Sequence, residues 1–158
     1  MDIISHGLWG AAVAPQKELI ISSMISGIVP DLWTIPFLLR YAFVKRLRKM
    51  SLSEFWNTIP PELHKLYHYF HSFVILVVIA VIMVWLFKVI WWLLLPWLIH
   101  LVLDIFSHQG DLRAKMFYPL SKYRFRSFTN WFESPVLTIV NWVVVLIIVT
   151  WRILVGSY

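Results

Sequence analysis

The chain has 158 residues, of which 60% are hydrophobic and ten are tryptophan, and its mean hydropathy is +0.75. This composition is too apolar for an ordinary water-soluble domain and favours a membrane protein. The absence of cysteine excludes disulfides and thiolate metal ligands. A net charge of +6 is compatible with nucleic-acid binding, but the basic residues flank apolar runs, which is more typical of contact with an anionic membrane surface.

The first third of the chain predicts short helices over residues 3–14 and 17–28. Pro30 predicts an interruption there, since proline disfavours helical geometry at Val29 and is well suited to start a new helix. Residues 31–49 then continue as a helix that ends in the basic run KRLRK. The N-terminal MDIISHGLWG lacks the basic start and small-residue cleavage site of a removable signal peptide.

The middle of the chain predicts a long helical hairpin. Pro60 and Pro61 favour a helix start, and residues 62–88 predict one helix of about 27 residues, roughly 40 Å long. Residues 89–107 return with a kink at Pro96. Residues 108–133 predict an ordered basic loop in which short strands are possible, and Pro135 starts a last helix that ends near Leu154.

Three of these segments are long and apolar enough to span a membrane, namely residues 70–88, 89–107 and 135–155. Residues 19–39 are a weaker candidate for a spanning or re-entrant segment. We therefore predict a single domain over residues 1–158, an all-α integral membrane protein with three to four spanning or re-entrant helices. Basic residues cluster on one side, which the positive-inside rule makes cytoplasmic, and leave only Lys88 and Arg152 for the other side.

The stretch HLVLDIFSH places two ionisable side chains, His100 and Asp104, one turn apart on the same face of an apolar helix. Ionisable groups inside membrane segments are costly and usually functional. Two interpretations are open: a metal site, or a hydrogen-bonded pair in which each group satisfies the other. In an antiparallel hairpin His71 would face both residues.

Two further groups occur at compatible depth, Asp31 after Pro30 and His6 in the first predicted helix. Such a set of nitrogen and oxygen donors suits zinc, with manganese and iron as alternatives, and is large enough for one or two ions. Sites with two metals commonly hydrolyse phosphate esters. Among the other histidines, His64 is expected at the surface and His68 behind a ligand, whereas a ligand role for His108 is left open.

Several motifs occur in an order that resembles one family. SHGLWG, GIVPDL, the HS of YHYFHS and HLVLD are followed by FYPLS and YRF, so that the resemblance covers residues 6 to about 125. Together they resemble the YdjM-type, LexA-regulated family of metal-dependent hydrolases of the bacterial inner membrane. The resemblance implies a helical, multi-pass membrane protein whose metal-site residues are His6, Asp31, His71, His100 and Asp104.

A more distant similarity is to zinc-dependent phospholipases C and P1-type nucleases. It implies that Asp104 bridges two zinc ions, that Asp31, His71 and His100 complete one of them, and that His6 helps to hold the other. The chain departs from these families in two respects. KLYHYFHS stands where many relatives have His-Arg-Gly before His-Ser, and no histidine follows His108, so that a third zinc is not expected.

These observations predict a membrane-bound metal-dependent hydrolase of a phosphoester, such as a phospholipid or lipid-linked phosphate, at the cytoplasmic leaflet. Asp31 is the candidate catalytic residue, a ligand that also orients or deprotonates water. Arg113, Lys122 and Arg124 are candidate substrate-binding residues, because guanidinium and ammonium groups bind phosphate, although attraction to anionic lipid headgroups explains them as well.

The expected partners are membrane lipid and a phosphate-containing substrate rather than nucleic acid, and the oligomeric state is left open. One alternative is a non-catalytic membrane protein whose metal is structural and which binds lipid or a protein partner. A metal or proton transporter is a second alternative, weakened by the lack of a polar path to the opposite face.

Overall fold

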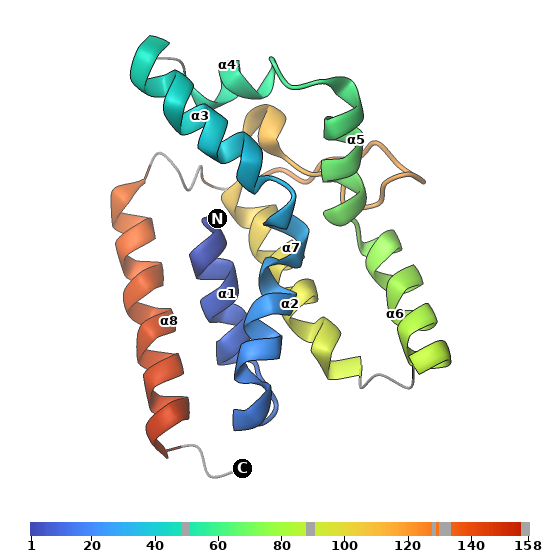
Figure 1. Cartoon of the computed structure of the whole chain (residues 1–158), viewed down its shortest axis with the longest axis vertical. Coiled ribbons are helices and arrows are strands. Elements are labelled where there is room, and N and C mark those ends of the chain that lie inside the picture. Colours follow the sequence, from blue (N-terminus) through green and yellow to red (C-terminus); the bar gives the residue numbers. More distant parts are fainter. Residues whose placement is uncertain (49–50, 88–90, 128, 130–133, 156–158) are drawn as a thin grey trace.

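The computed structural model describes residues 1–48, 51–87, 91–127, 129 and 134–155. All regular elements within these residues are helical, which confirms the predicted all-α class. In chain order (Figure 1) they are α1 (Ile3–Ala12), the 3-10 helix η1 (Lys17–Leu19), α2 (Ile20–Leu32), α3 (Ile35–Arg48), α4 (Leu52–Trp56), α5 (Pro61–Phe70), α6 (Phe73–Phe87), η2 (Trp91–Leu94), α7 (Leu95–Ser107), η3 (Gly110–Leu112) and α8 (Pro135–Val155).

Helix α1 is the centre of the bundle, since it packs against α2, α7 and α8. Figure 1 shows α1 between α8 and α2, with α6 on the other side of α7. Helices α3 and α4 lie across the end of the bundle at which α1 begins and α7 ends. The apolar core at this end includes Phe55, Trp56, Tyr67 and Leu101. It therefore surrounds the ends of α5 and α7 that bear the histidines.

Two glycines allow α1 and α2 to touch through their backbones. A Cβ atom on Gly10 would lie 2.3 Å from the carbonyl oxygen of Ser23, and one on Gly27 would lie 2.6 Å from the carbonyl oxygen of His6. No side chain fits at either position. Small residues serve the same purpose in membrane helices, where close backbone approach drives association. The contact at Gly27 thus sets the position of His6.

Helix α8 is joined to α1 by a polar residue, Asn141, in a largely apolar helix. The side-chain carbonyl of Asn141 accepts a hydrogen bond from the Trp9 indole at 2.8 Å, and its amide donates to Ser5 Oγ at 3.0 Å. Arg152 donates to the carbonyl oxygen of Ala14 at the opposite end of the helix pair. Since dispersion contacts between apolar helices are not directional, these hydrogen bonds fix the register of α8.

The predicted interruption at Pro30 is wrong. Helix α2 continues through Pro30 to Leu32, and the chain bends only at Trp33 and Thr34. Proline removes one helical hydrogen bond, but the side chain of Pro30 is fully buried and its packing supports the helix locally. Asp31 therefore lies in the last turn of a helix instead of opening a new one.

The single helix predicted over residues 62–88 is also wrong, because α5 and α6 are bent by 59° at His71 and Ser72. Bonds to a distant segment replace helical ones at this point. The Phe73 amide donates to the carbonyl of Met116 at 2.8 Å, and Ser72 Oγ donates to the carbonyl of Tyr118 at 2.6 Å. Local sequence gives no sign of these partners. Lys88, the predicted end of this helix, lies outside the described residues.

Three smaller expectations changed. Pro96 lies in the first turn of α7, where proline is tolerated, instead of kinking a longer helix. The described part of the loop after α7 has the short helix η3 and no strand. Helix α4 was not predicted, although Ser51 and Glu54 form a capping box at its start. The last helix, Pro135–Val155, confirms the prediction for that segment.

One described helix, α8, is long and apolar enough to cross a membrane. The number rises to three if two bent pairs each count as one span, Lys17–Leu32 with Ile35–Val44 and Pro61–Phe70 with Phe73–Leu86. The span predicted over residues 89–107 is not among these candidates, because the apolar helix described there, Trp92–Ser107, has fewer than 18 residues. Side chains on α6 and α8 are highly exposed, with Trp85 at 80% and Leu154 at 77%. Such apolar surfaces are typical of contact with lipid or a partner.

We expect Gly27→Ala to destabilise the fold by about 1–3 kcal/mol, because the new methyl group would overlap the α1 backbone. Gly7→Ala is the matched control, since its Cβ would lie 3.2 Å from the flexible Ile28 side chain and at an ordinary contact distance of 3.9 Å from the Met24 carbonyl oxygen. Thermal unfolding in detergent would measure both. Equal stability of the two variants would contradict the close backbone contact between α1 and α2.

Candidate metal centre

Four helical segments bring the five predicted ligands together inside the bundle. His6 comes from α1, Asp31 from the last turn of α2, His71 from the end of α5, and His100 and Asp104 from α7. The side chains of four of them are at most 2% exposed, whereas that of Asp31 is 14% exposed. Asp31 is therefore the member of the cluster that solvent or a substrate can approach.

His100 lies at the middle of the cluster. Its Nε2 atom is 3.2 Å from His71 Nε2 and 3.3 Å from Asp104 Oδ2, and it is 3.9 Å from Asp31 Oδ2. His71 Nε2 is 3.2 Å from Asp31 Oδ1 and 3.5 Å from Asp104 Oδ2. The predicted proximity of His71 to both α7 residues is thus confirmed. The arrangement places two carboxylates around two imidazole nitrogens.

Hydrogen bonds on the outer edges of the rings fix which nitrogen faces inward. His100 Nδ1 is 2.7 Å from the carbonyl oxygen of Gly27, and His71 Nδ1 is 3.0 Å from that of Tyr67. A carbonyl only accepts, so each Nδ1 donates a proton. In the neutral rings the two Nε2 lone pairs then point at each other over 3.2 Å. A cation between them removes this repulsion, and histidine ligands of metals typically make such outer hydrogen bonds.

His6 has the same need for a partner. Neither of its ring nitrogens has a hydrogen bond among the described residues, although both are buried. Its Nε2 atom lies 3.1 Å from Asp104 Oδ1, and its ring stacks on that of His100 with centroids 3.6 Å apart. Buried polar atoms are almost always satisfied, so the orphaned nitrogens indicate a ligand.

Two groups of three residues have donor atoms close enough to share one ion, His6 with His100 and Asp104, and Asp31 with His71 and His100. Both use His100, whose single Nε2 lone pair binds one ion at a time. The cluster can thus hold one ion in either group, or two ions if the carboxylates bridge. A donor set of imidazole nitrogen and carboxylate oxygen fits zinc, manganese or iron.

Asp104 Oδ1 has further contacts, among them one from His108, whose role the sequence left open, and one from Met1, which was not predicted. His108 Nδ1 lies 3.2 Å from Asp104 Oδ1, and the Met1 amino group donates to the same oxygen at 3.1 Å and to Ser107 Oγ at 2.9 Å. His108 thus joins the cluster on its outer side. One helical turn between Asp104 and His108 was a usable signal, whereas no local pattern indicates Met1.

His64 and His68 lie outside the cluster. His68 is buried, but its Nδ1 accepts a hydrogen bond from the Lys115 amide at 3.4 Å, so it contacts the basic loop instead of orienting a ligand as predicted. His64, predicted at the surface, is half-buried against the carbonyl oxygens of Trp56 and Ile59. Both histidines connect α5 to neighbouring segments.

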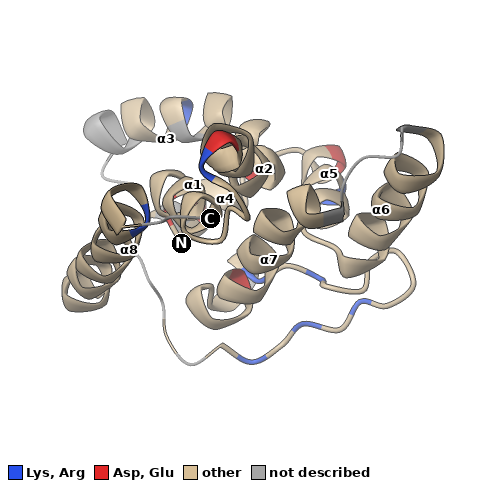
Figure 2. Cartoon of the chain, turned by 90° about the horizontal axis from the view of Figure 1, so that it is seen from below, with Lys and Arg blue, Asp and Glu red and all other residues tan. Residues whose placement is uncertain are grey.

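The predicted substrate-binding residues Arg113, Lys122 and Arg124 all belong to the segment after α7. Figure 2 shows the basic residues spaced along the extended loop after α7. Lys122 is exposed and Arg124 is half-buried. Burial lowers the pKa of Lys115, and the positive charges of Arg124 and Lys122 lower it further. This segment therefore carries mutually repelling charges.

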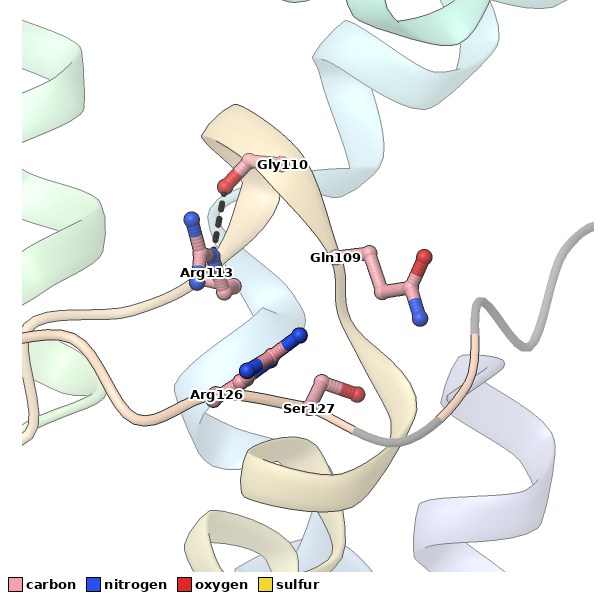
Figure 3. A pocket seen from close by; sticks show the side chains of 5 residues that line it. All are labelled: Gln109, Gly110, Arg113, Arg126 and Ser127. Atoms are coloured by element: carbon pink, nitrogen blue, oxygen red, sulfur yellow. Dashed lines mark hydrogen bonds between the residues drawn. The ribbon is translucent and has the colours of Figure 1, made fainter.

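A pocket of about 740 Å³ lies at the start of the same loop (Figure 3). It is lined by Gln109, Gly110, Arg113, Arg126 and Ser127. Arg113 is the one predicted substrate-binding residue that lines it. Arg126 was not among the predicted substrate-binding residues.

Comparison with known proteins finds no matching family model, no matching curated protein and no matching solved structure. The geometry of the five-residue cluster is therefore the feature on which a functional proposal depends.

We expect the detergent-purified protein to hold about one or two divalent ions per chain, and His71→Ala, His100→Ala and Asp104→Ala to lower the affinity for the ion at least about tenfold. Elemental analysis after dialysis would measure the content. His64→Ala is the control, because it removes a histidine from the same part of the fold but outside the cluster. A folded wild-type protein without metal, prepared without chelator, would contradict the site.

Proposed function

We propose that the protein is a membrane-bound, metal-dependent hydrolase of a phosphoester, such as a phospholipid or lipid-linked phosphate, that acts at the cytoplasmic leaflet. We also propose that the protein belongs to the family that the ordered motifs resemble, the YdjM-type hydrolases. The observation that carries it is the pair of inward-facing Nε2 atoms of His71 and His100, enclosed by Asp31 and Asp104.

The location of the cluster supports a phosphate-containing substrate. It lies at the end of α7 from which the basic loop departs, so anionic groups are attracted to the same end of the bundle. The apolar surfaces of α6 and α8 are exposed, and these helices extend away from that end of the bundle (Figure 1), which supports contact between them and lipid. A lipid phosphate would then approach at the depth of the cluster.

A bound divalent ion would supply Lewis acidity toward a phosphoryl oxygen and a nucleophile from water at neutral pH. The protein contributes orientation and proton transfer. Asp31 is the member with access from outside, and its Oδ2 lies within 4.0 Å of both His6 and His100. It is therefore placed to accept a proton from an attacking water while the other members, which are more buried, hold their positions.

A structural metal site in a non-catalytic protein is the second candidate. The near-complete burial of His6, His71, His100 and Asp104 favours it, because structural sites are usually closed. The exposure of Asp31 favours the hydrolase instead, because catalysis needs one open position.

We expect Asp31→Asn to lower hydrolysis at least about 100-fold, since the amide no longer accepts a proton in the reaction. Metal content should be retained, because the amide oxygen remains a donor. Release of phosphate or headgroup from a panel of phospholipids and lipid phosphates would measure the rate. His64→Ala should keep wild-type activity.

If the metal site were structural, none of the phospholipids and lipid phosphates would be hydrolysed. His100→Ala would then lower the unfolding temperature in proportion to the metal that it loses. Hydrolysis by Asp31→Asn at the wild-type rate would overturn the assignment of Asp31.

The absence of cysteine allows the orientation to be tested with single-cysteine variants. Lys122 is exposed on the basic loop, and Lys17 is exposed in η1, near the end at which Arg152 contacts Ala14. In the proposed orientation Lys17 joins Lys88 and Arg152 on the side opposite the basic loop. We expect an impermeant maleimide to label Lys122→Cys only from the cytoplasmic side and Lys17→Cys only from the opposite side. Labelling of both from one side would contradict a membrane-spanning arrangement.

A further inference from the structure

We propose that the pocket lined by Arg113, Arg126 and Gln109 binds a phosphate group of the substrate beside the metal centre. This inference rests on the proposed function and deepens it, because it replaces Lys122 and Arg124 with a defined binding pocket. The substrate class it indicates is a molecule that carries a phosphate group within reach of the ion-binding cluster.

The two arginines are held at the pocket by separate contacts. Arg113 Nε donates to the carbonyl oxygen of Gly110 at 3.0 Å, which leaves its terminal amino groups for a ligand. The φ of 61° at Gly110 is readily adopted by glycine and lets the chain turn there. Ser127 Oγ donates to the carbonyl oxygen of Phe106 at 2.7 Å, which fixes the backbone next to Arg126 against α7.

The pocket carries two positive charges from Arg113 and Arg126. Neither Arg113 nor Arg126 has an ion pair with an acidic side chain in the part of the chain that the structure describes. Figure 3 shows the Arg126 side chain extending, in this view, between Arg113 and Gln109. Two guanidinium groups that line one pocket repel each other, and an anion removes the repulsion. Phosphate fits best, because its oxygens accept paired hydrogen bonds from guanidinium groups and one from an amide.

The pocket is next to the metal centre along the chain. Gln109 directly follows His108, whose Nδ1 lies 3.2 Å from Asp104 Oδ1. One helical turn and one peptide unit separate the Cα atoms of Asp104 and Gln109, so they lie within about 10 Å of each other. A single substrate molecule can span this distance. The exposed Lys122 and the half-buried Arg124 line no part of this pocket.

The test is binding of three probes to the full-length protein in detergent, namely inorganic phosphate, inorganic pyrophosphate and dioctanoyl phosphatidate, by isothermal titration calorimetry. We expect Arg126→Gln and Arg113→Gln each to weaken binding about tenfold, since each removes charge-assisted hydrogen bonds. Arg126→Lys should recover part of the loss. Lys122→Gln removes the same charge from an exposed site on the same loop and should change binding less than twofold. Metal content is measured for every variant, and only variants with the wild-type content are compared, so that the metal centre contributes equally to phosphate binding.

Tighter binding of dioctanoyl phosphatidate than of the two inorganic probes, lost in Arg126→Gln, would support a membrane lipid as the source of the phosphate. Equal binding of pyrophosphate, lost in the same variant, would support a soluble phosphate compound. Equal weakening by Arg126→Gln and Lys122→Gln would overturn the pocket, as would the absence of binding to the wild type. An arginine-dependent loss in a protein that holds no metal would leave the pocket standing and contradict the hydrolase.

Discussion

The meeting of two imidazole nitrogens inside an apolar bundle is the constraint on which the rest of the structure depends. His71 and His100 donate their outer protons to backbone carbonyls, so their inner lone pairs face each other at 3.2 Å. Two carboxylates and the buried ring of His6 lie around the same point. In a low-dielectric interior, a cation between the two nitrogens would remove the repulsion between their lone pairs. The helices must therefore be positioned closely enough to hold that charge.

The departures from regular helix geometry serve this purpose. The bend between α5 and α6 directs His71 inward, and it exists because Ser72 and Phe73 bond to carbonyls of the loop after α7. The backbone contact at Gly27 brings α1 against α2 and also supplies the carbonyl that orients His100. Gly27 thus determines the position of His6 and the orientation of the His100 ring. Local rules failed at the bend because the partners of Ser72 and Phe73 lie more than forty residues away in sequence.

The cluster of candidate ligands was predictable because ionisable residues are rare in apolar segments and their spacing limits which of them can meet. The antiparallel pairing of His71 with His100 and Asp104 followed from chain direction alone. Helix α4 was also predictable, since Ser51 and Glu54 form a recognisable capping box. The role of Arg126 was not, because its place in the pocket depends on a bond between Ser127 and the end of α7. Contacts between segments distant in sequence leave no periodic pattern.

Among the five clustered residues, solvent exposure is concentrated at Asp31, and this limits the chemistry that the cluster can perform. Asp31 is the partly exposed ligand, while α8 and the apolar face of α6 present hydrophobic surface. The pocket at Gln109 opens one residue beyond His108, on the same end of the bundle as the basic loop. A substrate with an apolar tail and an anionic head satisfies both surfaces at once, whereas a fully water-soluble substrate uses only the second. The combined arrangement therefore favours a lipid phosphate over a soluble one for the proposed reaction.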